Sequence, residues 1–188
     1  MTTNTAPLLT IDDLTALPDD DGNTYELLEG ELIVSSAPSI RHQRVIKNLT
    51  TALDNYLAQT PIGEVLPTPG VIFDRHNSVI PDIVFVTNEQ LGQIGSDPHI
   101  RLAPALAVEV VSPGSENARR DRVSKVKVYG KFGVGEYWVA DPVARTVEIY
   151  RPAEGALVLA ATVGGDEELT SPLLPGFACK ASRVFGTG

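Results

Sequence analysis

Two stretches of the sequence are almost entirely apolar, and each carries one acidic residue. Asp82 is the only charge within residues 79–86, and Glu109 is the only charge within residues 106–111. Strands that are apolar on both faces are typical of a sheet interior. An unpaired ionised carboxylate there costs on the order of several kcal/mol, so each acid must be neutral, paired or holding a cation. For either acid alone, an exposed sheet edge or a pair with a structural arginine such as Arg101 is the simpler interpretation.

Together, the two acids indicate a metal site. Adjacent strands lie about 4.8 Å apart, so side chains on the same face can share one cation. Magnesium prefers oxygen ligands, keeps several waters and usually takes one or two protein carboxylates. Asp82, Glu109 and a strand carbonyl, which we expect to be that of Val110, would suffice for Mg²⁺ or Mn²⁺.

The order of the expected elements favours a mixed α/β fold with a central mixed sheet. Apolar residues three and four apart predict helices, and β-rich runs between turn signals predict strands. The elements, in order, are a helix from Ser39 to near Pro61, strands at 64–74, 79–86 and 106–111, a helix at 117–132 closed by Gly133, and a strand at 136–140. The core therefore has the order helix, strand, strand, strand, helix, strand.

Shorter segments flank this core on both sides. The N-terminal hairpin turns at Gly30, where glycine accepts a positive φ, and it is expected at the edge of a sheet. The segments are a lead-in with a small helix at 1–23, hairpins at 25–34 and 146–162, and an irregular Pro-rich tail at 171–188. No linker or internal repeat divides residues 1–188, which predicts a single domain.

Cysteine content and the N-terminal pattern bear on the cellular compartment. Cys179 is the only cysteine, so no internal disulfide can form, and a cysteine-based zinc site lacks ligands. Residues 1–10 show no signal-peptide pattern, and no apolar run approaches the roughly 18 residues of a membrane span. We therefore expect a cytoplasmic protein that does not enter a membrane.

Overall charge opposes binding of nucleic acid by bulk attraction, since 24 acids against 15 Lys and Arg give a net charge of −9. A local basic patch is the alternative, and residues 116–131 contain six cations against two acids. Arg119, Arg120 and Arg122 are the candidate DNA-binding residues of this patch. An ordinary solvated helix face is the competing interpretation.

Within that helix, Lys125 is expected to point inward. At 100° per residue, Lys125 lies close to the direction shared by Tyr129, Phe132 and other apolar residues, whereas Lys127 lies about 160° away. Lys125 is therefore placed toward the two strand acids and Lys127 toward solvent. A snorkelling side chain, or a helical ion pair with Asp121, remains the alternative for Lys125.

These residues together resemble the PD-(D/E)XK nuclease superfamily and, within it, the Uma-two family of small stand-alone endonucleases. The resemblance covers most of the chain. It rests on residues 25–32, the Arg41-His42-Gln43 triplet, Pro81-Asp82, residues 108–113, Asp121 with Lys125 and Tyr129, and residues 133–142. It implies a restriction-endonuclease-like core that binds DNA, and nucleases of this fold often act as homodimers.

The resemblance also implies roles for matching residues. Asp82 would be the metal-binding acid of the Pro-Asp motif and Glu109 the acid of the second motif. The superfamily lysine is missing two residues later, where Val111 stands, and Lys125 of the following helix would replace it, with Lys127 as a less favoured substitute.

Glu26 and His42 are second-tier candidates. Glu26 is polar in a mainly apolar strand and would extend the acidic cluster, although an exposed hairpin acid is an equal alternative. His42 lies on the apolar stripe of the first helix, where a buried structural histidine is the simpler interpretation. The alternatives for His42 are contact with a phosphate or orientation of Glu109.

Three functions remain open. The leading hypothesis is a Mg²⁺-dependent endonuclease in which a metal-activated water attacks the DNA phosphodiester in line, leaving, as the resemblance implies, a 5′-phosphate and a 3′-hydroxyl. The second is a nuclease-fold module without catalysis that binds DNA or a protein, which the Val111 departure favours. A glycosidase using Asp82 and Glu109 as its carboxylate pair is the weakest.

Overall fold

The computed structural model describes residues 7–18, 21–112 and 114–186, and it places six α-helices, one π-helix and twelve strands in them. The elements in chain order are α1 (Ile11–Leu14), β1 (Thr24–Leu28), β2 (Glu31–Ser35), α2 (Ile40–Leu57), β3 (Gly63–Pro67), β4 (Val71–Asp74), β5 (Asn77–Val79), β6 (Ile83–Thr87), α3 (Asn88–Ile94), β7 (Leu106–Val110), α4 (Ser115–Arg119), η1 (Arg120–Lys125), α5 (Val126–Phe132), β8 (Glu136–Asp141), β9 (Thr146–Ala153), β10 (Ala156–Gly164), β11 (Glu168–Ser171), β12 (Leu174–Lys180) and α6 (Ala181–Phe185).

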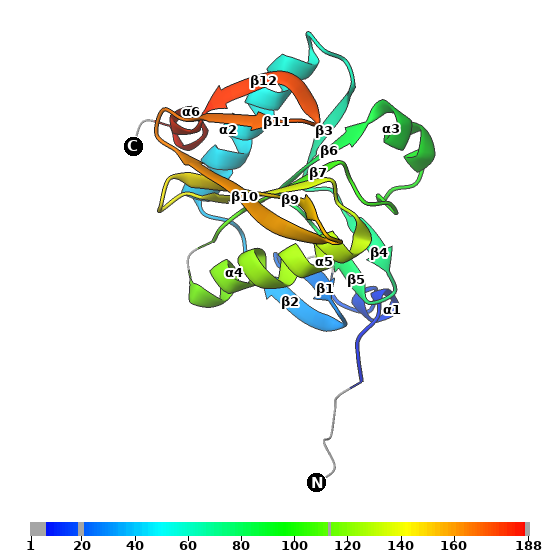
Figure 1. Ribbon diagram of the computed structural model, residues 1–188. Coiled ribbons are helices and arrows are strands. Elements are labelled where there is room, and N and C mark those ends of the chain that lie inside the picture. Colours follow the sequence, from blue (N-terminus) through cyan, green and yellow to red (C-terminus); the bar gives the residue numbers. More distant parts are fainter. Residues whose placement is uncertain (1–6, 19–20, 113, 187–188) are drawn as a thin grey trace.

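A six-stranded mixed sheet forms the centre of the fold, with the strand order β10-β9-β8-β7-β6-β3. Only β7 and β8 in this sheet pair in parallel. Helix α2 lies against one face and the α4–η1–α5 segment against the other (Figure 1). The predicted mixed α/β class is confirmed, and so is the order of its core elements.

The two strands that carry the predicted acids lie in the middle of this sheet, and their side chains alternate between its faces. Ile83 and Val108 pack on the α2 side, whereas Val84 and Ala107 pack on the α5 side. Because alternate residues share a face, Glu109 lies on the α5 side, in the same layer as Ala107. The apolar runs are therefore buried on both faces, as predicted.

The predicted strands 64–74 and 79–86 are each split between two sheets. Their outer parts, β3 and β6, join the central sheet, while β4 and β5 join a four-stranded sheet of order β2-β1-β5-β4. Pro81 lies between β5 and β6, and proline cannot donate a ladder hydrogen bond, so the chain changes sheets there. The expected four-residue loop between the runs is a two-residue turn, because Asp74 pairs with Asn77.

Both predicted hairpins are present. The first turns at Glu29 and Gly30, both with positive φ (52° and 79°), which suits a tight two-residue hairpin turn. Its expected position at a sheet edge is only half right: β2 is an edge strand, but β1 also pairs with β5. The C-terminal hairpin, β9 and β10, is longer than predicted. The short helix α1 lies in the predicted lead-in segment.

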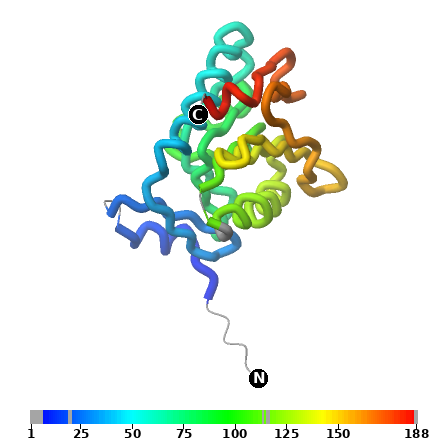
Figure 2. Tube along the Cα trace, turned by 90° about the vertical axis from the view of Figure 1, so that its left-hand side faces the viewer, coloured from blue at the N-terminus to red at the C-terminus, as the bar shows by residue number. Residues whose placement is uncertain are grey.

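The prediction of an irregular C-terminal tail was wrong. Strands β11 and β12 form a two-stranded sheet, and α6 follows and packs beside α2 in both views (Figures 1 and 2). Pro175 and Gly176 lie inside β12, and such residues are tolerated where a strand has a free edge. Residues 187–188 lie outside the described part of the chain, and so do residues 1–6 and 19–20 of the lead-in segment.

The second predicted helix is continuous from α4 to α5, but its middle part is a π-helix. Gly133 ends it in the left-handed conformation, with a φ of 84°, as predicted. Val123 in the π turn is 56% exposed, whereas Lys125 lies inside. No helix in the described ranges is long and apolar enough to cross a membrane.

Candidate active site

Asp82 lies at the junction of the two sheets, directly before β6. The antiparallel register pairs Ile83 with Val108, so extending it by one position brings Asp82 opposite Glu109. Asp82 Oδ2 accepts a hydrogen bond from the backbone N–H of Val110 at 2.7 Å. The structure thus brings together the two acids that the sequence identified.

Glu109 is buried at 5% exposure, and two side chains of the helix on its face of the sheet bind it. Its Oε1 accepts hydrogen bonds from Lys125 Nζ at 2.8 Å and from the Tyr129 hydroxyl at 2.7 Å. Lys125 is 2% exposed, so it does not snorkel to solvent. The π-helical segment therefore places a buried lysine against Glu109.

Lys125 also bridges to the small sheet. Its Nζ donates to Glu26 Oε1 at 3.1 Å, and the same oxygen accepts from the backbone N–H of Ile80 at 2.8 Å. Glu26 is therefore buried and joins the acidic cluster, and the alternative of an exposed hairpin acid is wrong. The ion pairs of Lys125 are with Glu26 and Glu109, and the described contacts include none between Lys125 and Asp121.

His42 orients Asp82 rather than Glu109. Its Nε2 lies 2.9 Å from Asp82 Oδ1, and its Nδ1 lies 3.4 Å from the hydroxyl of Ser112. A hydrogen-bonded histidine at the start of α2 fixes the rotamer of the acid. The simpler interpretation of His42, a buried structural histidine, agrees with its 6% exposure and these contacts, and the acid that it contacts is Asp82, not Glu109.

Asp121 and Arg120 form an incompletely paired couple beside these groups. Asp121 is 2% exposed, and its Oδ1 lies 3.5 Å from Arg120 Nε. Neither atom has a hydrogen-bond partner, although both are buried. Buried polar atoms without partners are uncommon in folded proteins, and they often mark a place where a ligand or water binds.

Burial and excess negative charge act together on the ionisation of the cluster. Burial raises the pKa of Glu109 well above its ordinary value, with further increases from Asp82 and Asp121 and a decrease from Lys125. Burial also raises the pKa of Asp121. Burial alone would lower the pKa of Lys125, but the surrounding carboxylates outweigh it and raise that pKa, so the ammonium stays charged.

A cavity of about 150 Å³ gives access to the cluster. Its lining combines the acids, the basic groups beside them and the start of α2. The lining includes Glu26, His42, Gln43, Asp82, Glu109, Val110, Ser112, Arg120, Asp121 and Lys125. The cavity is thus a polar pocket between the two sheets, which a small ion or one phosphate group can enter.

The fit of a divalent cation can be tested on the acid oxygens. The described residues hold no group of three or more His, Cys, Asp or Glu side chains set to bind a metal. Each Asp82 oxygen accepts one hydrogen bond, however, and Glu109 Oε2 accepts none from the described residues. These free lone pairs, in a pocket with more acids than cations, fit a cation held by two carboxylates and water.

The backbone of Val110 lies beside Asp82. Its N–H points toward Asp82, and the N–H and C=O of one strand residue point to the same side. The carbonyl of Val110 therefore faces the Asp82 side of β7, away from β8.

The remaining predicted residues lie outside the cavity, except for Arg120. Lys127 is exposed and pairs with Glu29 at 2.7 Å. Arg119 is exposed next to Arg120, whereas Arg122 binds Asp141 and Glu148 at 2.9 and 2.7 Å. Arg119 and Arg120 thus line a second pocket together, whereas Arg122 is held by two carboxylates.

Tyr129 and Asp121 are the site residues that sequence reasoning left without a role. The signal was present, because both share a helical ladder with Lys125 at four-residue spacing. Tyr137, in contrast, is fully buried and packs edge-on against Tyr129, so it belongs to the core.

Comparison with known proteins adds family and fold. The model of the Uma2 family, described as "Putative restriction endonuclease", matches residues 11–182. A solved structure of a "putative nuclease belonging to DUF820" from Anabaena variabilis ATCC 29413 has 18% identity and a TM-score of 0.75, over 94% of this chain and 97% of that one. The two proteins therefore share a fold.

A second solved structure, the type IIG restriction endonuclease BpuSI, matches with 16% identity and a TM-score of 0.41, over 80% of this chain and 16% of that one. No curated protein matches the chain.

Proposed function

The chain belongs to the Uma2 family, and on that premise we propose that it is a metal-dependent endonuclease that hydrolyses phosphodiester bonds of DNA. One observation carries the proposal: two acids on adjacent strands lie in one cavity, and a buried lysine reaches one of them from the following helix. This is the set of groups that phosphodiester hydrolysis needs, since it combines cation ligands with a fixed positive charge.

Asp82 and Glu109 would hold the cation together with the carbonyl of Val110. When bound there, a divalent cation polarises the scissile phosphate and lowers the pKa of a bound water. The hydrogen bonds from His42 and from the Val110 N–H hold Asp82 in one rotamer, so that its orientation is set before a ligand arrives.

Lys125 and Arg120 would act on the phosphate. The Lys125 ammonium remains charged at neutral pH and is held beside Glu109, where it can orient water or stabilise charge that develops during attack. Arg120 lines the same cavity, and its Nε has no hydrogen-bond partner. Its guanidinium is therefore available to donate to a phosphate oxygen.

Cleavage assays on plasmid, single-stranded and branched DNA with Mg²⁺ or Mn²⁺ test the proposal. Asp82→Asn should lower the cleavage rate by at least about 100-fold, since it removes a ligand charge. The matched control is Asp54→Asn, which changes an exposed acid of α2 outside the cavity and should retain activity.

If the wild type cleaved none of these DNA forms with either metal, the proposed endonuclease activity would be wrong. If the same protein still bound DNA, the non-catalytic nuclease-fold module would replace it. That module would retain the cavity and lose the chemistry, as the Val111 departure allows.

A further inference from the structure

We propose that a second surface of the molecule, formed where α2 meets α6, binds the phosphate backbone of DNA beyond the point of cleavage. The proposal rests on the proposed function and adds the path of the substrate. Five exposed cations define this α2/α6 basic surface: Arg41, Arg44, Lys47, Arg145 and Arg183.

These cations differ from many others in the chain because they have no acidic partner. Arg101, Lys127 and Lys180 each pair with a nearby carboxylate. No residue of the α2/α6 basic surface has a carboxylate within ion-pair distance in the described ranges. In a protein with a net charge of −9, unpaired cations on one surface create the local attraction that the molecule as a whole lacks.

The geometry of α2 places its cations in line with a groove. At 100° per residue, Arg41 and Arg44 lie on the same stripe as Asn48, and Lys47 flanks it. The buried face of the helix, which includes Leu49, points roughly the opposite way. Toward the C-terminus of α2 the stripe continues as the polar residues Thr51 and Asn55, which with Asn48 form one wall of the groove.

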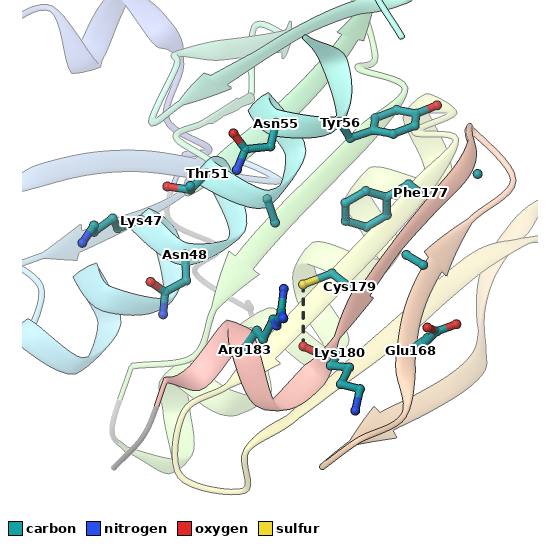
Figure 3. A pocket seen from close by; sticks show the side chains of 13 residues that line it. Lys47, Asn48, Thr51, Asn55, Tyr56, Glu168, Phe177, Cys179, Lys180 and Arg183 are labelled. Carbon is teal, nitrogen blue, oxygen red and sulfur yellow. Dashed lines mark hydrogen bonds between the residues drawn. The ribbon is translucent and has the colours of Figure 1, made fainter. Parts of the chain in front are cut away.

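The groove has a volume of about 710 Å³, and its other wall is built by β12 and α6 (Figure 3). Arg183 of α6 extends between the two walls, and Lys180 lies at the end of β12. Asn48 Nδ2 donates to the carbonyl of Val184 at 3.0 Å, which ties the walls together. The groove is thus open and partly apolar, with Tyr56 and Phe177 in its lining and cations on both sides.

The surface is continuous with the candidate active site through α2. His42 and Gln43 line the active-site cavity, and Lys47 lines the groove on the same helix. Five helical residues span about 7.5 Å, and one DNA strand rises about 3.4 Å per nucleotide along its axis. The α2 residues that line the cavity and the groove are therefore separated along the helix axis by about the rise of two nucleotides.

The polar residues of the surface suit contacts to DNA phosphates. Arg, Lys, Asn and Thr side chains make most protein contacts to DNA phosphates, and such contacts position the duplex without reading its sequence. Glu168 on the far wall and Asp166, which pairs with Lys180, mark the limit of the surface.

A charge-matched pair of triple variants tests the surface. The test variant is Arg41→Gln/Arg44→Gln/Lys47→Gln, and the control is Arg75→Gln/Arg101→Gln/Lys131→Gln, which removes the same charge far from α2. Binding of a fluorescent 20-base-pair duplex is measured by anisotropy in EDTA, over a range of salt concentrations. Unfolding midpoints of both variants confirm that they fold.

The test variant should bind at least about 10-fold more weakly, and its slope of log K against log salt should fall by up to ~0.9 for each phosphate that is no longer neutralised. The control should change the affinity less than about 2-fold. Arg183→Gln, on the opposite wall, should also reduce the slope, by the amount expected for about one phosphate.

If the wild type cleaves DNA but the test and control variants lose affinity equally, the proposed role of the α2/α6 basic surface is wrong. The proposed endonuclease activity is then unaffected. A wild type that neither binds nor cleaves DNA would overturn both. Asp82→Asn should bind the duplex like the wild type while failing to cleave it, which separates the α2/α6 basic surface from the chemistry.

Discussion

Lys125 and Glu109 form a buried ion pair, 2.8 Å between Nζ and Oε1, across 16 residues of sequence. The superfamily pattern would supply a lysine from the strand itself, two residues after the acid, where this chain has Val111. Here the lysine comes from a π-helical segment on the face of the sheet that carries Glu109. The positive charge beside Glu109 therefore comes from a residue that is distant in sequence and is brought there by tertiary packing.

Lys125→Ala should have two effects. Cleavage should fall by roughly 10²- to 10⁴-fold, because a charge-stabilising group is removed. Stability should fall by about 3–5 kcal/mol, because Glu26 and Glu109 lose a buried partner. The turnover of folded protein and the urea midpoint measure the two effects separately.

Lys127→Ala is the matched control, since Lys127 lies two residues away and its ion pair among the described residues is an exposed one with Glu29. Its stability should change by less than about 1 kcal/mol. Equal reductions of turnover in the two variants would contradict the assigned role of Lys125 and point to a general effect of charge.

His42→Ala should weaken Mn²⁺ binding by about 10- to 100-fold, because Asp82 loses the group that orients it. Thermal shift as a function of Mn²⁺ concentration measures this, as only metal bound to the native state stabilises the fold. His42→Gln, whose amide can still donate to the acid, should restore part of the affinity. His99→Ala, in an exposed loop, should behave as the wild type, and a common midpoint for all four proteins would contradict the role of His42.

Arg119 and Arg122 should respond differently to the same substitution. Arg119→Gln should reduce the salt slope of DNA binding by up to ~0.9, as expected when one phosphate is no longer neutralised. Arg122→Gln should lower stability and leave that slope unchanged, because its guanidinium is engaged by Asp141 and Glu148. If Arg122→Gln reduced the salt slope of DNA binding and left stability unchanged, Arg122 would bind DNA together with Arg119 and Arg120, as the sequence predicted.

Asp141 makes stability depend on pH. Partial burial acts against the shift, but hydrogen bonds from the backbone of Ala144 and from Arg122 lower the pKa of this carboxyl. A group with a depressed folded-state pKa stabilises the protein above its unfolded pKa of about 3.9, and this contribution disappears as the pH falls through the folded value. Asp141→Asn should therefore be less stable than the wild type at pH 7, and the difference should shrink below about pH 4. A difference that stays constant from pH 7 to pH 3 would contradict this assignment.

The site acids could be predicted because burial of a lone charge leaves a strong signal in an apolar sequence. Asp82 and Glu109 each stand alone in a strand that is buried on both faces. The inward direction of Lys125 also followed from helix geometry. The π-helical form of residues 120–125 did not, because a step of 100° per residue describes an α-helix.

The division of the chain between two sheets was not predictable from local pattern. Residues 64–74 and 79–86 each resemble one strand, and only the pairing of β1 with β5 shows that their inner parts belong elsewhere. The role of Glu26 follows from that pairing, since it brings β1 beside Ile80 and the site. Long-range partners of this kind leave no local sequence signal, and the same holds for β12.

The junction of the two sheets at Pro81 has a consequence for folding, because the candidate active site is complete only when both sheets have formed. Glu26 belongs to the small sheet, Glu109 to the large one, and Lys125, 99 residues after Glu26, to the helix that contacts both. A chain that has assembled only one of these parts has the charges but not the pocket, and each charge remains hydrated. Any activity of this site is therefore a property of the finished tertiary structure.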